Sequence, residues 1–168
     1  MERQWEIDNN RERARLKKIV DEISDEELQL VIYEEGWTIA VMLAHIAYWD
    51  LWTLLKMRQW KACGEVKATP INWETFDKEL MPNDTMLPFL IALPPRVAAN
   101  MAVGWAESVD GQLAESDPVF LAEIEKLGDE SRLYRSQHRK MHLDEIEAFL
   151  KKARKEKKDD SKRKRRYL

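Results

Sequence analysis

With 168 residues and one cysteine, Cys63, the chain is long enough to bury the core of a single domain and cannot form an internal disulfide framework. Its charged first residues, MERQWEIDNNRER, and the lack of an apolar run near ~20 residues argue against a secretory signal and a membrane span. A net charge of −3 and only five glycines beside many Leu, Ala, Glu, Lys and Arg favour a soluble, cytoplasmic, all-α protein without a membrane partner.

The first two predicted helices occupy residues 9–23 and about 37–62. The apolar positions of the first keep the i, i+3, i+4, i+7 spacing of one buried face: Leu16, Ile19, Val20 and Ile23. The second, WTIAVMLAHIAYWDLWTLLKMRQW, starts after Gly36 and is apolar on most sides, so it should lie deep in the fold. Gly64 suits the end of this helix.

A long connection follows at residues 64–94, with prolines at 70, 82 and 88 and a short helical turn expected at 73–80. Such a connection is uncommon in a compact domain unless it covers a site or spans a bundle. The third helix should start at the two prolines at 94–95 and run to about residue 114. Small residues along it would let neighbouring helices come close: Ala98, Ala99, Ala102, Gly104 and Ala106. No segment alternates convincingly enough to predict a strand.

A short helix at 118–127, a break at Gly128 and a fourth long helix at about 133–153 complete the body. Four long helices are most economically arranged as an antiparallel four-helix bundle with a long crossover between helices two and three. We assign residues 1–152 to this bundle and residues 153–168 to a basic tail.

The basic tail and the rest of the chain carry opposite net charges. Residues 151–168, KKARKEKKDDSKRKRRYL, carry 11 Lys or Arg and three acidic residues, a local charge of +8 that leaves −11 on residues 1–150. An acidic body lacks the basic face of a nucleic-acid-binding domain, so no nucleic-acid partner is expected. The tail could touch nucleic acid, acidic protein or anionic lipid, but a solvated, frayed helix end is the simpler interpretation. Residues beyond about 155 should be dispensable for stability, because they have no apolar stripe to bury.

All three histidines fall on helix faces that a bundle would turn inward. Two of them, His138 and His142, are one turn apart on the fourth helix, and His45 lies in the middle of the second. His45 shares its face with Val41, Met42, Trp49 and Trp52. The pair shares its face with Glu145, Ile146 and Phe149, while Arg139, Lys140 and Asp144 are expected to point more towards water.

Three buried histidines are hard to explain as packing, because each would need its own polar partner. A core histidine bonded to a carbonyl is the alternative for any one of them. One divalent ion would satisfy all three, so we predict a metal site made by His45, His138 and His142, with nitrogens at roughly 2.0–2.2 Å and the remaining positions open. Three imidazoles suit zinc, nickel, iron and copper alike.

Two other metal chemistries fit less well. The sequence HRKMH lacks the glutamate of H-E-x-x-H, because Arg139 occupies that place, which argues against a zinc protease of that class. A di-iron bundle needs a carboxylate three residues before each histidine. The corresponding residues here are Arg135 before His138 and Arg139 before His142.

The segments around the histidines resemble the DinB/YfiT-like superfamily, which includes the N-terminal domain of mycothiol-dependent maleylpyruvate isomerase. The resemblance rests on WTIAVMLAHIAYWD at 37–50 and HRKMHLDEI at 138–146, and it covers roughly residues 9–152. It implies a four-helix bundle, often dimeric, in which His45, His138 and His142 bind a divalent metal. Thiol-dependent transferases and isomerases are known in this superfamily, and many members have no assigned reaction.

Three functions stay open. The first is a metal-dependent enzyme, a thiol transferase or hydrolase that acts on a small electrophile with a low-molecular-weight thiol. Here Met42, Trp49 and Phe149 would form an apolar wall, and Glu145 would act as a general base or orient a ligand. The second is a non-catalytic metal-binding or stress-response bundle. The third is an interaction module with structural histidines, in which the basic tail carries the activity.

Overall fold

The computed structural model describes residues 3–67, 82–127 and 132–165, and most of them are helical, which confirms the all-α class. The long helices are α1 (Gln4–Glu22), α3 (Ile39–Cys63), α6 (Pro95–Ala114) and α8 (Arg135–Arg165). The short elements are α2 (Asp25–Leu28), β1 (Val31–Tyr33), β2 (Trp37–Thr38), α5 (Pro82–Ile91) and α7 (Pro118–Lys126).

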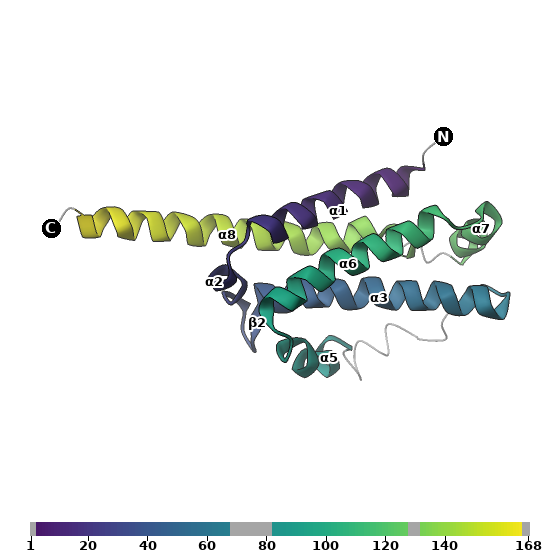
Figure 1. Ribbon diagram of the computed structural model, residues 1–168, viewed down its shortest axis with the longest axis horizontal. Helices are drawn as coiled ribbons and strands as arrows, with labels where there is room; N and C mark the ends of the chain where they lie inside the picture. The colour runs from purple at the N-terminus through teal and green to yellow at the C-terminus, as the bar shows by residue number, and fades with distance from the viewer. Residues whose placement is uncertain (1–2, 68–81, 128–131, 166–168) are drawn as a thin grey trace.

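The long helices lie side by side, with α1 and α3 each packed on both α6 and α8 (Figure 1). Helices α3 and α6 run in the same direction, opposite to α1 and α8 (Figure 1). Helix α6 starts at the end of the molecule at which α3 begins (Figure 1). The expected antiparallel arrangement therefore describes α1 with α6 and α3 with α8, whereas two neighbouring pairs are parallel: α3 with α6, and α1 with α8.

Local capping fixes where α2 and α3 begin and end. The Ser24 hydroxyl accepts the Glu27 N–H at 3.2 Å, and the Glu27 carboxylate accepts the Ser24 N–H at 3.1 Å, which is a complete capping box. The Thr38 hydroxyl accepts the Val41 N–H at 3.2 Å at the start of α3. Gly64 ends α3 in the left-handed region with φ 68°, as the sequence predicted.

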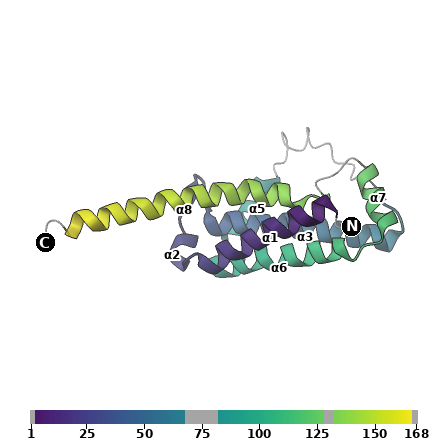
Figure 2. The ribbon, with the colours of Figure 1, turned by 90° about the horizontal axis from the view of Figure 1, so that it is seen from above.

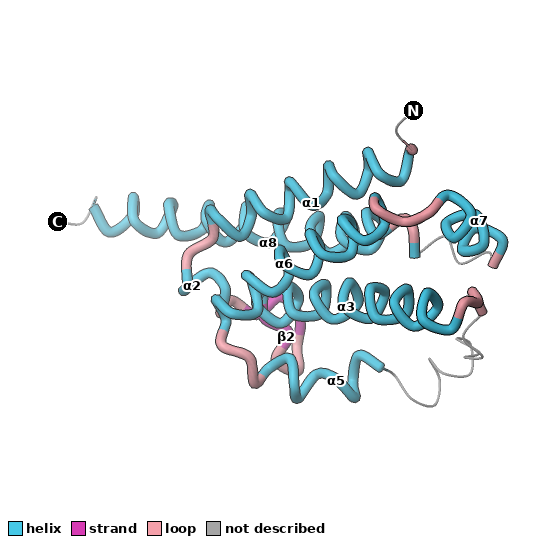
Figure 3. Tube along the Cα trace, turned by 45° about the vertical axis from the view of Figure 1, so that its right-hand side comes forward, coloured by secondary structure: helices cyan, strands magenta, loops and turns pink. Residues whose placement is uncertain are grey.

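The small hairpin of β1 and β2 was not predicted from the sequence. Val31 pairs with Thr38 and Tyr33 with Trp37 in antiparallel register, around a turn in which Glu35 and Gly36 both have positive φ. Strands of three and two residues are too short to show the alternation by which a strand is recognised. The hairpin lies at the start of α3 (Figure 3), so it brings new side chains close to that end of the helix.

Three further boundaries differ from the prediction. Helix α1 starts at Gln4 because Trp5 is buried in the core and extends the apolar face towards the N-terminus. Helix α5 lies inside the expected connection and contains Pro88, while the helical turn expected at 73–80 falls outside the described residues. Helix α8 continues to Arg165 instead of ending near residue 153, because the added residues are good helix formers without Gly or Pro.

Buried apolar side chains form two clusters along the long helices. The larger contains residues of α1, α3, α6 and α8, such as Leu16, Leu43 and Ile146, and the smaller is built around Trp5, Leu54, Met57 and Leu113. Three of the long helices also carry buried charged residues: Asp50 on α3, Asp110 on α6 and Arg139 on α8. The histidines lie near Asp50 along α3 and near Arg139 along α8.

None of the described helices has, by itself, the length and apolar character that crossing a membrane requires. The segments Thr85–Ile91 and Pro95–Ala114 meet this requirement only as a pair, and the chain bends by 115° between them. Four of the five small residues predicted to bring helices close are buried on α6, namely Ala98, Ala99, Ala102 and Ala106, whereas Gly104 is exposed.

Candidate metal centre

The structure brings the three histidines of the chain together from two helices. His45 Nε2 on α3 lies 3.1 Å from His138 Nε2 on α8. The three ring centroids lie 4.7–5.1 Å apart. One nitrogen of each ring lies within 4.8 Å of the other two, and His45 is only 4% exposed. The arrangement is therefore a compact group of three imidazoles that could hold one metal ion.

The nitrogen positions agree with the dimensions of a metal site. Two imidazole nitrogens bound to one tetrahedral ion at about 2.0–2.1 Å lie about 3.3–3.4 Å apart, close to the observed 3.1 Å. Among the described residues, two other ring nitrogens, His138 Nδ1 and His142 Nε2, are buried without a hydrogen-bond partner. Because buried polar atoms are nearly always satisfied, the Nε2 of His142 favours a ligand at this place, whereas His138 Nδ1 diverges from the Nε2 of its own ring and cannot bind the same ion.

Electrostatics keep the first two rings neutral. Burial, followed by the neighbouring His142 and Arg135, lowers the pKa of His45 to about 3. Burial likewise lowers the pKa of His138, with Arg135 as the next cause. Metal ligation requires the neutral imidazole, so both rings are in the required form at neutral pH.

Glu145 orients the third ring. Its carboxylate lies 3.1 Å from His142 Nδ1, which directs Nε2 towards the other histidines. Tyr33 lies near Glu145; burial, followed by the interaction with this carboxylate, raises the pKa of Tyr33. The sequence suggested Glu145 for this position, whereas Tyr33 was missed because it belongs to the unpredicted hairpin.

Tryptophan rings surround the histidines. The Trp37 ring centroid lies 5.6 Å from that of His45, and the Trp49 centroid lies 6.2 Å from His45 and 6.5 Å from His138, all edge-on. Trp49 was expected in an apolar wall. Of the other expected wall residues, Met42 is a buried member of the larger apolar cluster, and Phe149 is partly buried against it. Trp37, like Tyr33, reaches this region through the hairpin.

The prediction that Arg139 points towards water is wrong, because its side chain is fully buried. Its guanidinium donates to Asp50 Oδ2 at 2.9 Å and to the two carboxylate oxygens of Asp110 at 2.8 and 3.0 Å. Burial would lower the pKa of Arg139, but the two carboxylates raise it above its usual range. The partners come from α3 and α6, so the sequence of α8 alone did not contain this information. The neighbouring Lys140 and Asp144 are exposed, as predicted.

The same carboxylates connect all four long helices. Arg135 Nε donates to Asp50 Oδ1 at 2.8 Å, and Arg13 of α1 donates to Asp110 Oδ2 at 2.9 Å. We call these residues the ion network: Arg13, Asp50, Asp110, Arg135 and Arg139. The ion network adjoins the histidines on α8, because Arg139 follows His138 directly.

Comparison with known proteins supports the family suggested by the sequence. A profile of the DinB superfamily matches residues 9–155, which is most of the chain and nearly the range expected from the resemblance. No curated protein and no solved structure gives a significant match.

Proposed function

The chain belongs to the DinB superfamily, and we propose that it binds one divalent metal ion through His45, His138 and His142 and acts on a small electrophile. The 3.1 Å approach of two buried imidazole nitrogens carries this proposal. Two neutral ring nitrogens at that distance repel each other through their lone pairs unless a proton or a cation lies between them. A shared proton can satisfy the His45–His138 pair only, whereas one metal ion also satisfies the buried Nε2 of His142.

The donor set restricts the ion to borderline transition metals. Imidazole nitrogens suit zinc, nickel or iron, and hard ions such as magnesium and calcium prefer oxygen ligands. Three neutral ligands add no negative charge, so the ion would keep its full positive charge. Such an ion lowers the pKa of a bound water or thiol and polarises a substrate oxygen, which is the chemistry of hydrolysis and thiol transfer.

In this proposal the residues around the metal site orient a ligand, exchange a proton and exclude water. Glu145 fixes the orientation of His142 and, with a side chain that is 35% exposed, can exchange a proton with solvent. Trp37 and Trp49 exclude water from the rings, which strengthens electrostatic interactions with a substrate. A low-molecular-weight thiol is the nucleophile that we propose first, and water is the alternative.

A second candidate is a non-catalytic metal-binding protein. The observation in its favour is the enclosure of the site, because His45 is nearly inaccessible and tryptophan rings lie beside it. A structural metal site is closed, whereas a catalytic site keeps one coordination position open for water or substrate. Metal content and turnover distinguish these candidates.

Metal content is the first experiment. Protein purified without a nickel column should contain about one transition-metal ion per chain, and His142→Ala should lose it. Zinc at ~100 times its Kd should stabilise the wild type by about 2.7 kcal/mol, or about 5–10 °C. Met141→Ala, an exposed neighbour, is the matched control and should behave like the wild type. Failure of the reconstituted wild type to bind metal would refute the proposal.

Turnover is the second experiment. The metal-loaded protein and His142→Ala should be compared on epoxide, maleyl and haloarene electrophiles with low-molecular-weight thiols, and with water alone. We expect thiol-dependent or hydrolytic turnover that disappears in His142→Ala. If the wild type binds metal but gives the uncatalysed rate on every substrate, the non-catalytic candidate replaces the enzyme.

A further inference from the structure

The C-terminal half of α8 leaves the core and continues as a single projecting helix. Leu150 is the last residue of α8 in the larger apolar cluster, and the helix ends at Arg165. At about 1.5 Å per residue the projection is about 22 Å long. Figures 1 and 2 show it extending beyond the other helices. The segment expected to be a frayed tail is therefore helical as far as Arg165.

The charges of this projection are segregated around the helix. At about 100° per residue, six basic positions fall within an arc of about 100° that contains no acidic residue. We call them the basic stripe: Lys151, Arg154, Lys155, Lys158, Lys162 and Arg165. The three acids of the segment, Glu156, Asp159 and Asp160, lie together on another side. Like charges three and four residues apart repel each other, so the stripe costs stability unless an anion neutralises it.

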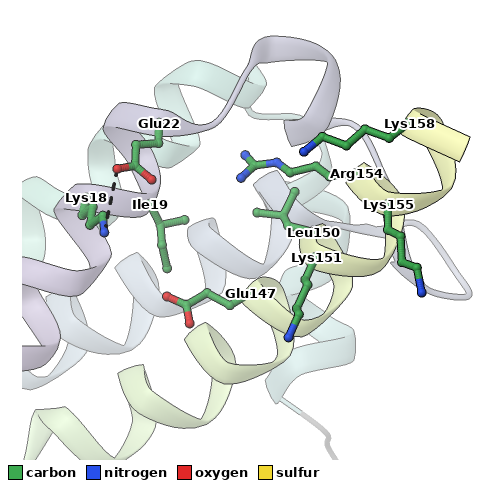
Figure 4. A pocket seen from close by; sticks show the side chains of 9 residues that line it. All are labelled: Lys18, Ile19, Glu22, Glu147, Leu150, Lys151, Arg154, Lys155 and Lys158. Atoms are coloured by element: carbon green, nitrogen blue, oxygen red, sulfur yellow. Dashed lines mark ion pairs between the residues drawn. The ribbon is translucent and has the colours of Figure 1, made fainter. Parts of the chain in front are cut away.

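The inner end of the stripe borders a groove between α8 and α1. The groove has a volume of about 500 Å³, and Ile19 and Leu150 form its apolar floor (Figure 4). Glu27 engages Arg154 at 2.6 and 2.9 Å. Within the described residues, no carboxylate forms an ion pair with the other stripe residues at the groove, Lys151, Lys155 and Lys158. Positive charge at the inner end of the stripe is thus available to a ligand.

We propose that the basic stripe binds the phosphate backbone of duplex DNA without sequence preference. From residue 154 to 165 the sequence RKEKKDDSKRKR contains no apolar side chain, so a partner can be held only by charge and hydrogen bonds. Membrane-surface helices need Leu, Phe or Trp, and protein interfaces use apolar anchors and are poor in Lys. Duplex DNA carries one charge per ~1.7 Å and is bound through Lys and Arg alone, and its ~12 Å major groove admits a helix.

The acidic body does not prevent this contact. Residues 1–150 carry −11, and this charge was the reason for expecting no nucleic-acid partner. Electrostatic interactions between exposed charges are largely screened beyond about 8 Å at physiological ionic strength. The stripe from Lys158 to Arg165 lies about 12–22 Å along the helix beyond Leu150. The outer part of the stripe can therefore meet DNA while the body remains at a distance.

Fluorescence anisotropy with a labelled duplex and the full chain tests the proposal. Kd is expected on the order of 10⁻⁶ to 10⁻⁴ M at physiological salt, and log K should fall with log salt with a slope of about −4 to −5 if most stripe residues contact phosphates. The triple variant K155Q/K158Q/K162Q should bind at least ~10-fold more weakly at about 50 mM salt and flatten the slope by about 2–3. K155R/K158R/K162R should keep wild-type binding, since it keeps the charge.

The matched control removes the same charge outside the stripe. K152Q/K157Q/K164Q should weaken binding less than ~3-fold, because its residues lie on other sides of the helix. All variants should keep the helix, since Gln and Lys have similar helix propensities, and far-UV circular dichroism checks this. Equal loss in both glutamine triples, no binding by the wild type at low salt, or tighter binding to phosphatidylserine vesicles or polyglutamate than to DNA would overturn the proposal. The outcome of this test does not depend on whether the three histidines bind a metal ion.

Discussion

His138 and Arg139 are neighbours on α8 but belong to two buried polar regions with opposite properties. Burial keeps His45 and His138 of the histidine group neutral, and two ring nitrogens of the group have no hydrogen-bond partner among the described residues. In the ion network, Arg139 is fully buried and charged, and it donates to Asp50, to both oxygens of Asp110 and to the Ala106 carbonyl. One face of α8 thus carries histidines with two nitrogens that are unpaired among the described residues, and another face carries a guanidinium that is hydrogen-bonded to two carboxylates.

This difference indicates that the ion network stabilises the fold, whereas the histidine group is suited to bind a ligand. A buried charge network whose members are hydrogen-bonded to one another across helices fixes the relative positions of those helices. A neutral polar group with free lone pairs contributes little to that task and keeps its affinity for a ligand. We therefore expect substitutions in the ion network to act on stability and substitutions at the histidine group to act on metal binding.

Breaking the ion network should have the largest effect. Arg139→Ala leaves Asp50 and Asp110 as buried carboxylates without their central cation, and removing one partner of a buried pair costs about 3–5 kcal/mol. Urea unfolding of the metal-free protein measures this loss. Lys140→Ala, an exposed neighbour paired with Asp144, is the matched control and should change stability by less than ~1 kcal/mol. Similar stability of the two variants would contradict the role of the network.

Acid should weaken the protein through the histidine group. In the metal-free protein the pKa of His45 is lowered to about 3 and that of His138 is also lowered, whereas in the unfolded chain both lie near 6.5. Below about pH 6.5 the unfolded chain binds more protons than the folded one. Stability is therefore complete above that pH and is lost as the pH falls, by about 1.4 kcal/mol per pH unit for each histidine.

Urea unfolding between about pH 7 and about pH 5, with a chelator present, tests this pH dependence. His45→Leu removes one of the two groups, so its free energy of unfolding should fall less steeply with acid than that of the wild type. The two slopes should differ by about 1.4 kcal/mol per pH unit. Equal slopes for the wild type and His45→Leu would show that His45 titrates normally.

The ligand-orienting role of Glu145 should appear in metal affinity. Glu145→Gln weakens the acceptor for His142 Nδ1 and should raise the Kd for zinc about 10–100-fold with little change in stability. Competition with a coloured chelator measures the Kd. Glu147→Gln is a suitable control, because Glu147 pairs with Arg15 on the surface. A decrease in affinity shared by both variants would point to a general charge effect instead.

The smallest effect on stability should come from the projecting part of α8. A chain that ends after residue 155 keeps both buried polar regions, and residues 156–165 of the segment that it loses carry no apolar side chain. Its free energy of unfolding should change by less than ~1 kcal/mol, which thermal unfolding measures. A decrease of many degrees in Tm would show that the projection packs on the body.

The sequence by itself determined the features that depend on neighbours along one helix. The apolar positions of α3 and the i, i+4 placement of His138 and His142 are local, and helical periodicity alone puts them on faces that turn inward. Gly64 ends α3 for an equally local reason, its left-handed backbone. The class of the fold, the three histidines and the superfamily could therefore be predicted without coordinates.

Only the tertiary structure decided which residues meet across elements. His45 and His138 are 93 residues apart, and their 3.1 Å approach depends on the packing of α3 against α8. A basic residue such as Arg139 is assigned to the surface by pattern, and it is buried here because two carboxylates from other helices compensate its charge. Tyr33 reaches Glu145 through a hairpin too short to have a pattern. In each case the decisive partner lies far away in sequence, where local periodicity carries no information.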